Sequence, residues 1–182
     1  MKKIKMGELE EIDKGRLKAF EIYYEVEKVE ENDEGKKLFE KLNEEGDELS
    51  KTMVEFITFS ELDSRQKEVF EKLNQYLKDE EEREKEKGHE EFEERRRKIV
   101  SYVQITLAKM YEENIGVDQN YEKSLQLFIL SAQSGNAVAY NEIGWKYMYG
   151  VGVELNYAEA FKYYKLGEKL DNPSTITFAA IF

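Results

Sequence analysis

The chain has 182 residues, and its 40% hydrophobic content is enough to bury one core or two small ones. Its net charge of −12 would repel a phosphate backbone, so nucleic acid is not an expected partner. No run of about 18 apolar residues and no signal-peptide pattern occurs, so we expect neither a membrane span nor export, and we place the protein in the cytoplasm.

Reactive side chains are few. The absence of cysteine excludes disulfides, thiolate metal sites and cysteine nucleophiles. The one histidine, His89, lies among charged residues without a second histidine to share a metal, and we interpret it as solvated. No spacing suggests a nucleophile with its base. We therefore expect no catalytic residue, no metal and no cofactor, and a small hydrolase is the least favoured alternative.

The first segment, residues 1–77, has the apolar spacing of helices, as at Phe20 and Tyr24. Turn-forming residues at 32–35 and 45–47 predict breaks between helices. We expect helical hairpins in an irregular, highly charged N-terminal region, because the first 98 residues hold 31 acidic and 22 basic side chains.

One short word recurs within this region. Residues 39–43 repeat identically at 70–74, an offset of 31. This is either the trace of duplicated, degenerate repeats or chance among glutamate-rich and lysine-rich helices, and the sequence leaves both interpretations open.

A charged connector follows at residues 78–98, where only Phe92 is a large apolar residue. Acid-first pairs four residues apart, such as Glu91 with Arg95, favour a solvated helix, and Gly88 favours a break in it. We interpret residues 95–98 as a solvated face and not as a basic docking patch, because glutamates one turn earlier neutralise them.

The second half contains a repeat with a period of 36 residues, and we assign two copies to residues 99–172. Six identical pairs share this offset: Tyr111 with Tyr147, Gly116 with Gly152, Val117 with Val153, Asn120 with Asn156, Tyr121 with Tyr157, and Asn136 with Asn172.

Each copy predicts a helix, a turn and a second helix. In the second copy, Ile143 and Tyr147 form the apolar face of the first helix, and Gly144 beside them permits close approach of a neighbour. Gly150 and Gly152 supply left-handed backbone for the turn, and Asn114 replaces the first of these glycines in the earlier copy.

The second helix begins after an asparagine cap, Asn120 or Asn156, and Glu159 completes a capping box in the second copy. Asn172 and Pro173 predict the start of a further helix. The second helix of each copy has an expected apolar stripe. It is formed by Tyr121, Ser124, Leu125, Phe128 and Ala132 in the first copy, and by Tyr157, Ala160, Phe161 and Tyr164 in the second.

This pattern resembles the Sel-one-like repeat, a relative of the tetratricopeptide repeat. The positions that carry the resemblance structurally are Tyr111, Gly116, Tyr121, Gly144, Tyr147, Gly150, Gly152, Tyr157 and Ala160. The resemblance implies an all-α fold in which antiparallel helical hairpins stack as a short α-solenoid. Residues 173–182 would then be a partial third repeat or a capping helix, although Glu168 and Asp171 depart from the family pattern.

The resemblance also implies a function, that of an adaptor or scaffold whose concave repeat surface holds a peptide or helix of an unknown partner protein. The residues predicted to line that surface are Lys109, Glu112, Glu113, Asn141, Trp145, Met148 and Tyr149. Trp145 is the foremost of these, because tryptophan is enriched among binding anchors, but a place in the core is an open alternative. A homodimer formed through the apolar end, residues 175–182, is the alternative function.

Overall fold

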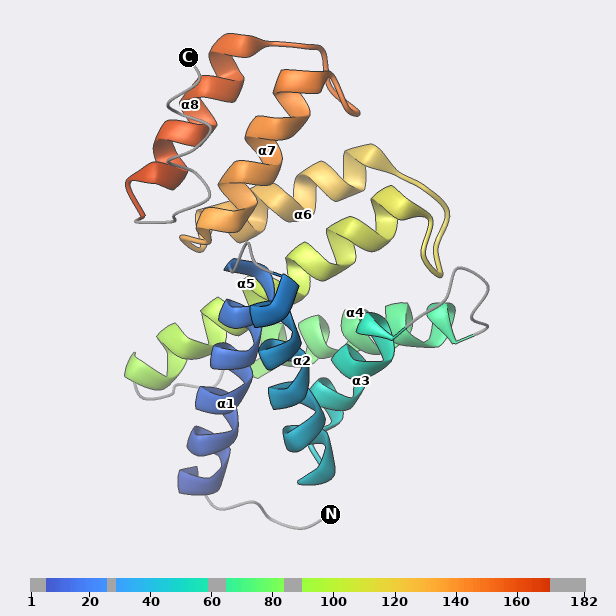
Figure 1. Ribbon diagram of the computed structural model, residues 1–182, viewed down its shortest axis with the longest axis vertical. Coiled ribbons are helices and arrows are strands. Elements are labelled where there is room, and N and C mark those ends of the chain that lie inside the picture. Colours follow the sequence, from blue (N-terminus) through green and yellow to red (C-terminus); the bar gives the residue numbers. More distant parts are fainter. Residues whose placement is uncertain (1–5, 26–28, 59–64, 84–89, 171–182) are drawn as a thin grey trace. The chain divides into compact units, whose positions relative to one another are not determined.

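Helices make up the regular structure of the chain (Figure 1). The computed structural model describes residues 6–25, 29–58, 65–83 and 90–170. Over these residues it contains eight α-helices and no strand, which confirms the all-α prediction. The helices are α1 Met6–Glu25, α2 Val29–Glu44, α3 Glu48–Ile57, α4 Gln66–Arg83, α5 Glu90–Glu113, α6 Tyr121–Gln133, α7 Ala137–Tyr149 and α8 Tyr157–Glu168. The chain divides into two compact units, Met1–Val100 and Ser101–Phe182, and the boundary falls within α5.

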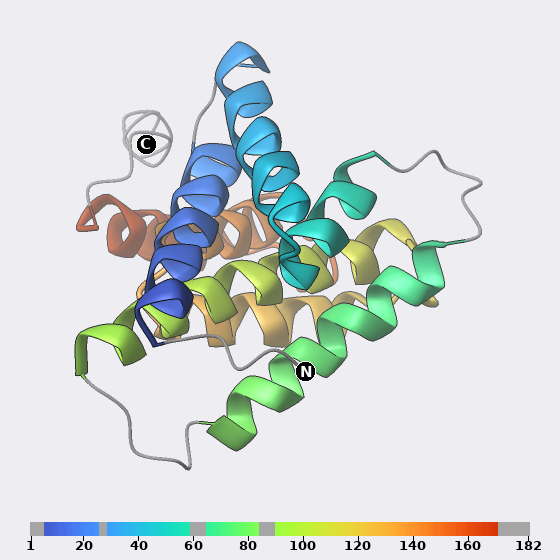
Figure 2. The same ribbon diagram turned by 90° about the horizontal axis from the view of Figure 1, so that it is seen from below.

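In the first unit, α1 and α2 pack side by side in both views (Figures 1 and 2). Phe20 and Phe39 are fully buried between them, with ring centroids 5.0 Å apart in an edge-to-face arrangement. Such aromatic pairs add stability beyond the apolar area that they bury. This pair therefore anchors the hairpin.

The break predicted at residues 32–35 is wrong, because α2 runs through these residues. A Cβ on Gly35 would lie 2.8 Å from the backbone nitrogen of Tyr23 and 3.0 Å from the carbonyl oxygen of Ala19. Gly35 is thus required for the close approach of α1 and α2 and not for a turn.

The turn predicted at residues 45–47 is confirmed. Gly46 has a φ of +91°, which glycine adopts without steric cost. Asp47 caps α3 by accepting a hydrogen bond of 2.9 Å from the backbone nitrogen of Ser50.

The start of α5 differs from the solvated connector that we expected, whereas Gly88 and His89 lie outside the described residues. The side chains of Arg95 and Arg96 are only 11% and 15% exposed. Arg96 lies near the carboxylates of Asp13 and Glu80, both of which are buried. The solvated interpretation of these two arginines is therefore wrong, because distant acidic residues of the first unit provide their counter-charges.

In the second unit, α6 packs on α7, and α7 packs on α8 (Figure 1). The fully buried side chains of Leu107 on α5, Phe128 on α6, Ile143 on α7 and Tyr164 on α8 form the core of this unit. A Cβ on Gly144 would lie 2.8 Å from the Tyr164 ring, so this glycine allows α8 to approach α7 closely. The small residue in the repeat pattern thus has the role predicted for it.

The predicted turn residues adopt left-handed backbone: φ is +58° at Asn114, +69° at Gly116, +68° at Gly150 and +70° at Gly152. Gly150 is the C-cap of α7. A Cβ on Gly152 would also collide with the Cβ of Tyr121, so the turn of the second copy rests directly on the first copy.

Asparagine caps are confirmed in both copies. Asn120 accepts a hydrogen bond of 2.9 Å from the nitrogen of Lys123, and Asn156 accepts two bonds of 3.1 Å each. The capping box at Glu159 is wrong, because the Asn156 nitrogen donates instead to the Tyr147 carbonyl at 2.8 Å. Glu159 pairs with Lys162 at 3.0 Å. The predicted cap at Asn172 and the helix start at Pro173 lie outside the described residues.

The expected apolar stripe of the second helices is only partly buried. Ser124, Phe128, Ala132, Ala160 and Tyr164 are buried as predicted. By contrast, Tyr121, Tyr157 and Phe161 are exposed, so their assignment to the core is wrong. Tyr121 and Tyr157 are the first residues of α6 and α8, and Phe161 lies on one flank of the stripe.

Candidate functional site

The first helices of the two repeats are joined by ion pairs. Lys109 on α5 lies 3.1 Å from Glu142 on α7, and Glu112 on α5 pairs with Lys146 on α7. Each pair connects one helix to the other, so α5 and α7 lie beside one another along the C-terminal half of α5. These ion pairs place Lys109 and Glu112, which the sequence assigned to one predicted surface, next to α7.

Lys146 is a buried residue that the sequence analysis did not identify. It is 1% exposed, and its Nζ lies 5.3 Å from the centre of the Phe128 ring and 5.9 Å from that of Tyr121. Burial lowers the pKa of Lys146 to about 8. Its counterpart in the first repeat, 36 residues earlier, is the buried Met110, which was the available signal that this position faces inward.

Trp145 and Tyr149 form an exposed aromatic pair on α7. They are 41% and 58% exposed, and their ring centroids are 5.1 Å apart. Trp145 therefore does not lie in the core of the second unit, an alternative that the sequence left open. Their counterparts in the first repeat, Lys109 and Glu113, are half-buried and exposed respectively. We call these four residues the first-helix surface.

Asn141 and Met148, also predicted to bind a partner, are half-buried. Their counterparts in the first repeat are Ile105, which is fully buried, and Glu112, which pairs with α7. These two positions therefore belong to the side of the helix that packs in the first repeat. The structure does not group them with the first-helix surface.

Two tyrosines at equivalent positions hold the turns. The carbonyl oxygens of Tyr111 and Tyr147 accept hydrogen bonds of 2.9 and 2.8 Å from Asn120 and Asn156. The Tyr147 ring also stacks on Tyr163 with centroids 5.6 Å apart. These contacts fix each turn to the helix before it, and they stabilise the structure without offering a binding surface.

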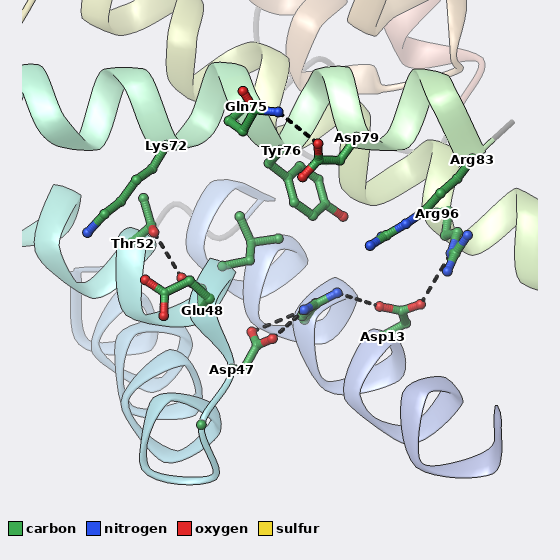
Figure 3. A pocket seen from close by; sticks show the side chains of 13 residues that line it. Asp13, Asp47, Glu48, Thr52, Lys72, Gln75, Tyr76, Asp79, Arg83 and Arg96 are labelled. Carbon is green, nitrogen blue, oxygen red and sulfur yellow. Dashed lines mark hydrogen bonds and ion pairs between the residues drawn. The ribbon is translucent and has the colours of Figure 1, made fainter. Parts of the chain in front are cut away.

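A second candidate is a cavity of about 440 Å³ in the first unit, lined largely by charged side chains (Figure 3). Arg16 donates hydrogen bonds to both carboxylate oxygens of Asp47, and its Nη1 donates to Asp13 at 2.8 Å. The Nε of Arg96 lies 3.7 Å from Asp13 and 3.9 Å from Glu80. Three helices and the start of α3 thus contribute to one network of charges.

Burial and pairing act in opposite directions on these groups. Burial raises the pKa of Asp13, and the charges of Arg16 and Arg96 offset only part of that rise. Burial also acts to raise the pKa of Asp47, but the hydrogen bonds from Arg16 and Ser50 hold it below its ordinary value. Each arginine that faces the network is near a carboxylate, so this cavity serves to hold the helices of the first unit together.

Metal binding has no support in the described part of the chain, where no cluster of three or more histidine or acidic side chains has a suitable arrangement. Among the same residues, no helix combines the length and apolar character needed to cross a bilayer.

The family model of the Sel1 repeat matches residues 101–136 and 137–172. This confirms the two repeats predicted from the 36-residue period, and the chain contains two Sel1 repeats. Sel1 repeats are typically protein-interaction modules. A search of the curated proteins gives no match.

Solved structures of this repeat type share the fold. A protective antigen of uropathogenic Escherichia coli strains, described as displaying an SLR fold, matches with a TM-score of 0.52 and 18% identity over 92% of this chain and 32% of that one. A Sel1 repeat protein from Oxalobacter formigenes matches with a TM-score of 0.54 and 14% identity over 97% of this chain and 65% of that one. The α-solenoid prediction is confirmed, and this chain spans less than two thirds of either relative.

Proposed function

We propose that the two Sel1 repeats act as a non-catalytic adaptor or scaffold, which binds a peptide or helix of a partner protein on the first-helix surface. The observation that carries this proposal is the exposed contact pair of Trp145 and Tyr149 on α7. Tryptophan and tyrosine are enriched among the residues that dominate binding energy, because they bury a large area and have few rotatable bonds.

The setting of this pair favours binding over a purely structural role. A regular helix holds both rings, and the ion pairs Lys109–Glu142 and Glu112–Lys146 fix that helix against α5. A surface that is ordered before it binds loses little conformational entropy when a partner arrives. The first-helix surface therefore meets the physical requirements of a docking site.

Capture experiments with variants test the proposal. The intact protein is immobilised and exposed to a lysate of its own cells, and retained proteins are identified by mass spectrometry. We expect a partner that the wild type retains and that both Trp145→Ala and Tyr149→Ala lose, with unchanged helical circular dichroism. Tyr157→Ala, which removes a 56% exposed tyrosine from α8, is the matched control. Retention of the same proteins by all three variants would contradict the proposal.

The second candidate function is a homo-oligomer. The segment predicted to form it, residues 175–182, lies outside the described residues, but the exposed side chains of α8 favour association on separate grounds. Tyr157 and Phe161 are exposed. Their counterparts in the first repeat are more covered, because the turn at Gly152 of the second repeat rests on Tyr121, and Leu125 is half-buried. An apolar face of this kind suits association with a second chain. Light scattering over a range of concentrations tests it: dimers that Phe161→Ser abolishes would favour it, and a monomer throughout would exclude it.

A further inference from the structure

We propose that the segment bound by the first-helix surface is basic, and that an arginine side chain of the partner stacks on Trp145 and Tyr149. This inference rests on the proposed function and adds the chemistry of the partner. Two independent observations support it: the charge that remains on the surface, and the absence of an internal cation over this aromatic pair.

The charge of the surface is negative once its internal pairs are counted. Lys109 is paired with Glu142, and Lys146 with Glu112, so neither lysine offers its charge to a partner. Glu113 is exposed, and within the described parts of the chain it has no ion pair. The net charge of −12 on the whole chain acts in the same direction and attracts basic segments over a longer range.

Aromatic rings elsewhere in the second unit already carry a cation. A lysine Nζ lies 5.3 Å from the ring centre of Tyr111, 5.7 Å from that of Phe161 and 5.7 Å from that of Tyr163. The buried Lys146 does the same for Phe128 at 5.3 Å. A cation over a ring face is attracted by the ring quadrupole, so this unit uses the interaction repeatedly.

The Trp145 and Tyr149 pair differs from those rings. Among the described residues, no lysine or arginine lies over either of them, although tryptophan is the ring that attracts cations most strongly. Both rings are also exposed, and the charge that remains on this surface is that of the Glu113 carboxylate. Arginine suits this position better than lysine, because its planar and weakly hydrated guanidinium stacks on aromatic rings.

The intrinsic fluorescence of the intact protein tests the inference, because Trp145 is the only tryptophan and reports on this surface alone. The probes are short peptides of one alanine and glutamine host sequence that carry arginine, lysine, citrulline or glutamate at the same position. Citrulline keeps the shape of arginine and removes its charge. We expect a saturable change in fluorescence with arginine, a weaker one with lysine, and none with citrulline or glutamate. The arginine response should also fall as salt is added.

Variants separate this surface from the general acidity of the chain. Tyr149→Ala and Glu113→Gln should each weaken arginine-peptide binding, by about tenfold for the aromatic change and less for the charge change. Glu122→Gln, which removes an exposed carboxylate from α6, is the matched control and should have no such effect.

The outcomes also distinguish this inference from the proposed function. Equal responses to arginine and citrulline, or no response to any peptide, would overturn the basic preference while leaving the capture experiment as an independent test of partner binding. Equal losses in Glu113→Gln and Glu122→Gln would show that the attraction is not specific to this surface, and would overturn the inference as well.

Discussion

Asp47 has two roles in the first unit, since it caps α3 and receives the bidentate hydrogen bonds of Arg16. Its pKa is held below the ordinary value of 3.8 even though burial acts to raise it, so the ionised form is stabilised by folding. The stabilisation is present above the pKa of the unfolded chain and is lost as pH falls through the pKa of the folded state.

Asp47→Asn should therefore destabilise the protein by about 2–3 kcal/mol at neutral pH, because the cap remains while the charge partner of Arg16 is lost. The difference from wild type should shrink as pH falls through the lowered pKa of Asp47, because the wild-type carboxyl then becomes neutral as well. Urea unfolding followed by circular dichroism measures it. A difference that is independent of pH would contradict the assigned role of the ionised carboxylate.

Two glycines with positive φ allow conformational strain to be separated from collision. Gly152→Ala places a Cβ against Tyr121, whereas Gly46→Ala meets nothing within 4 Å. We expect Gly46→Ala to cost about 1 kcal/mol from backbone strain alone, and Gly152→Ala to cost distinctly more. Thermal melting of both variants checks the order, and equal costs would contradict the close contact between the two repeats.

Residue roles that depend on local backbone were predictable from the sequence. The caps Asn120 and Asn156 and the left-handed Asn114 follow from chemistry within a few residues, so their positions were found correctly. Gly35 and Arg96 were misinterpreted, because their roles depend on helices that are distant in the sequence. No local pattern distinguishes a glycine in a turn from one at a helix contact.

At the scale of elements, the pair formed by Glu112 and Lys146 joins α5 to α7. Offset by 36 residues, these two positions hold Met148 and Met110, so each repeat has an apolar residue where the other has a charge. Methionine thus occupies the equivalent of each charged position in the other repeat.

Lys146→Met alone should destabilise the protein by about 2 kcal/mol, because it leaves the largely buried Glu112 without its counter-charge. The double variant with Glu112→Met should regain that stability to within about 1 kcal/mol, because apolar replacements of a buried ion pair are often neutral. Urea unfolding of the two variants tests the coupling. If the double variant were less stable than the single one, the ion pair would not be the relevant interaction.

Helix positions in the second unit were predictable because the same pattern of residues occurs in both copies of the 36-residue repeat. The inward placement of Lys146 was not, because a lysine on a helix is normally assigned to the surface. The exposure of Tyr121, Tyr157 and Phe161 was missed for the opposite reason, since aromatic residues at helical spacing are normally assigned to a core.

At the scale of the whole molecule, the chain combines a charged helical unit with two Sel1 repeats in a fold shared with solved Sel1 repeat structures. The periodicity predicted the solenoid, but it did not determine whether Trp145 faces solvent or the core. That depends on which face of α7 packs on α5 and α6, and this face is set by contacts between residues that are distant in the sequence.

Site-specific photo-crosslinking tests the central claim most directly. A photoreactive phenylalanine analogue is placed at Tyr149 on the first-helix surface or at Tyr157 on α8, in the full chain and in its own cells. Partner binding on the first-helix surface predicts a crosslinked protein from position 149 that is absent from position 157. Crosslinks from position 157 alone, or the same products from both positions, would contradict it.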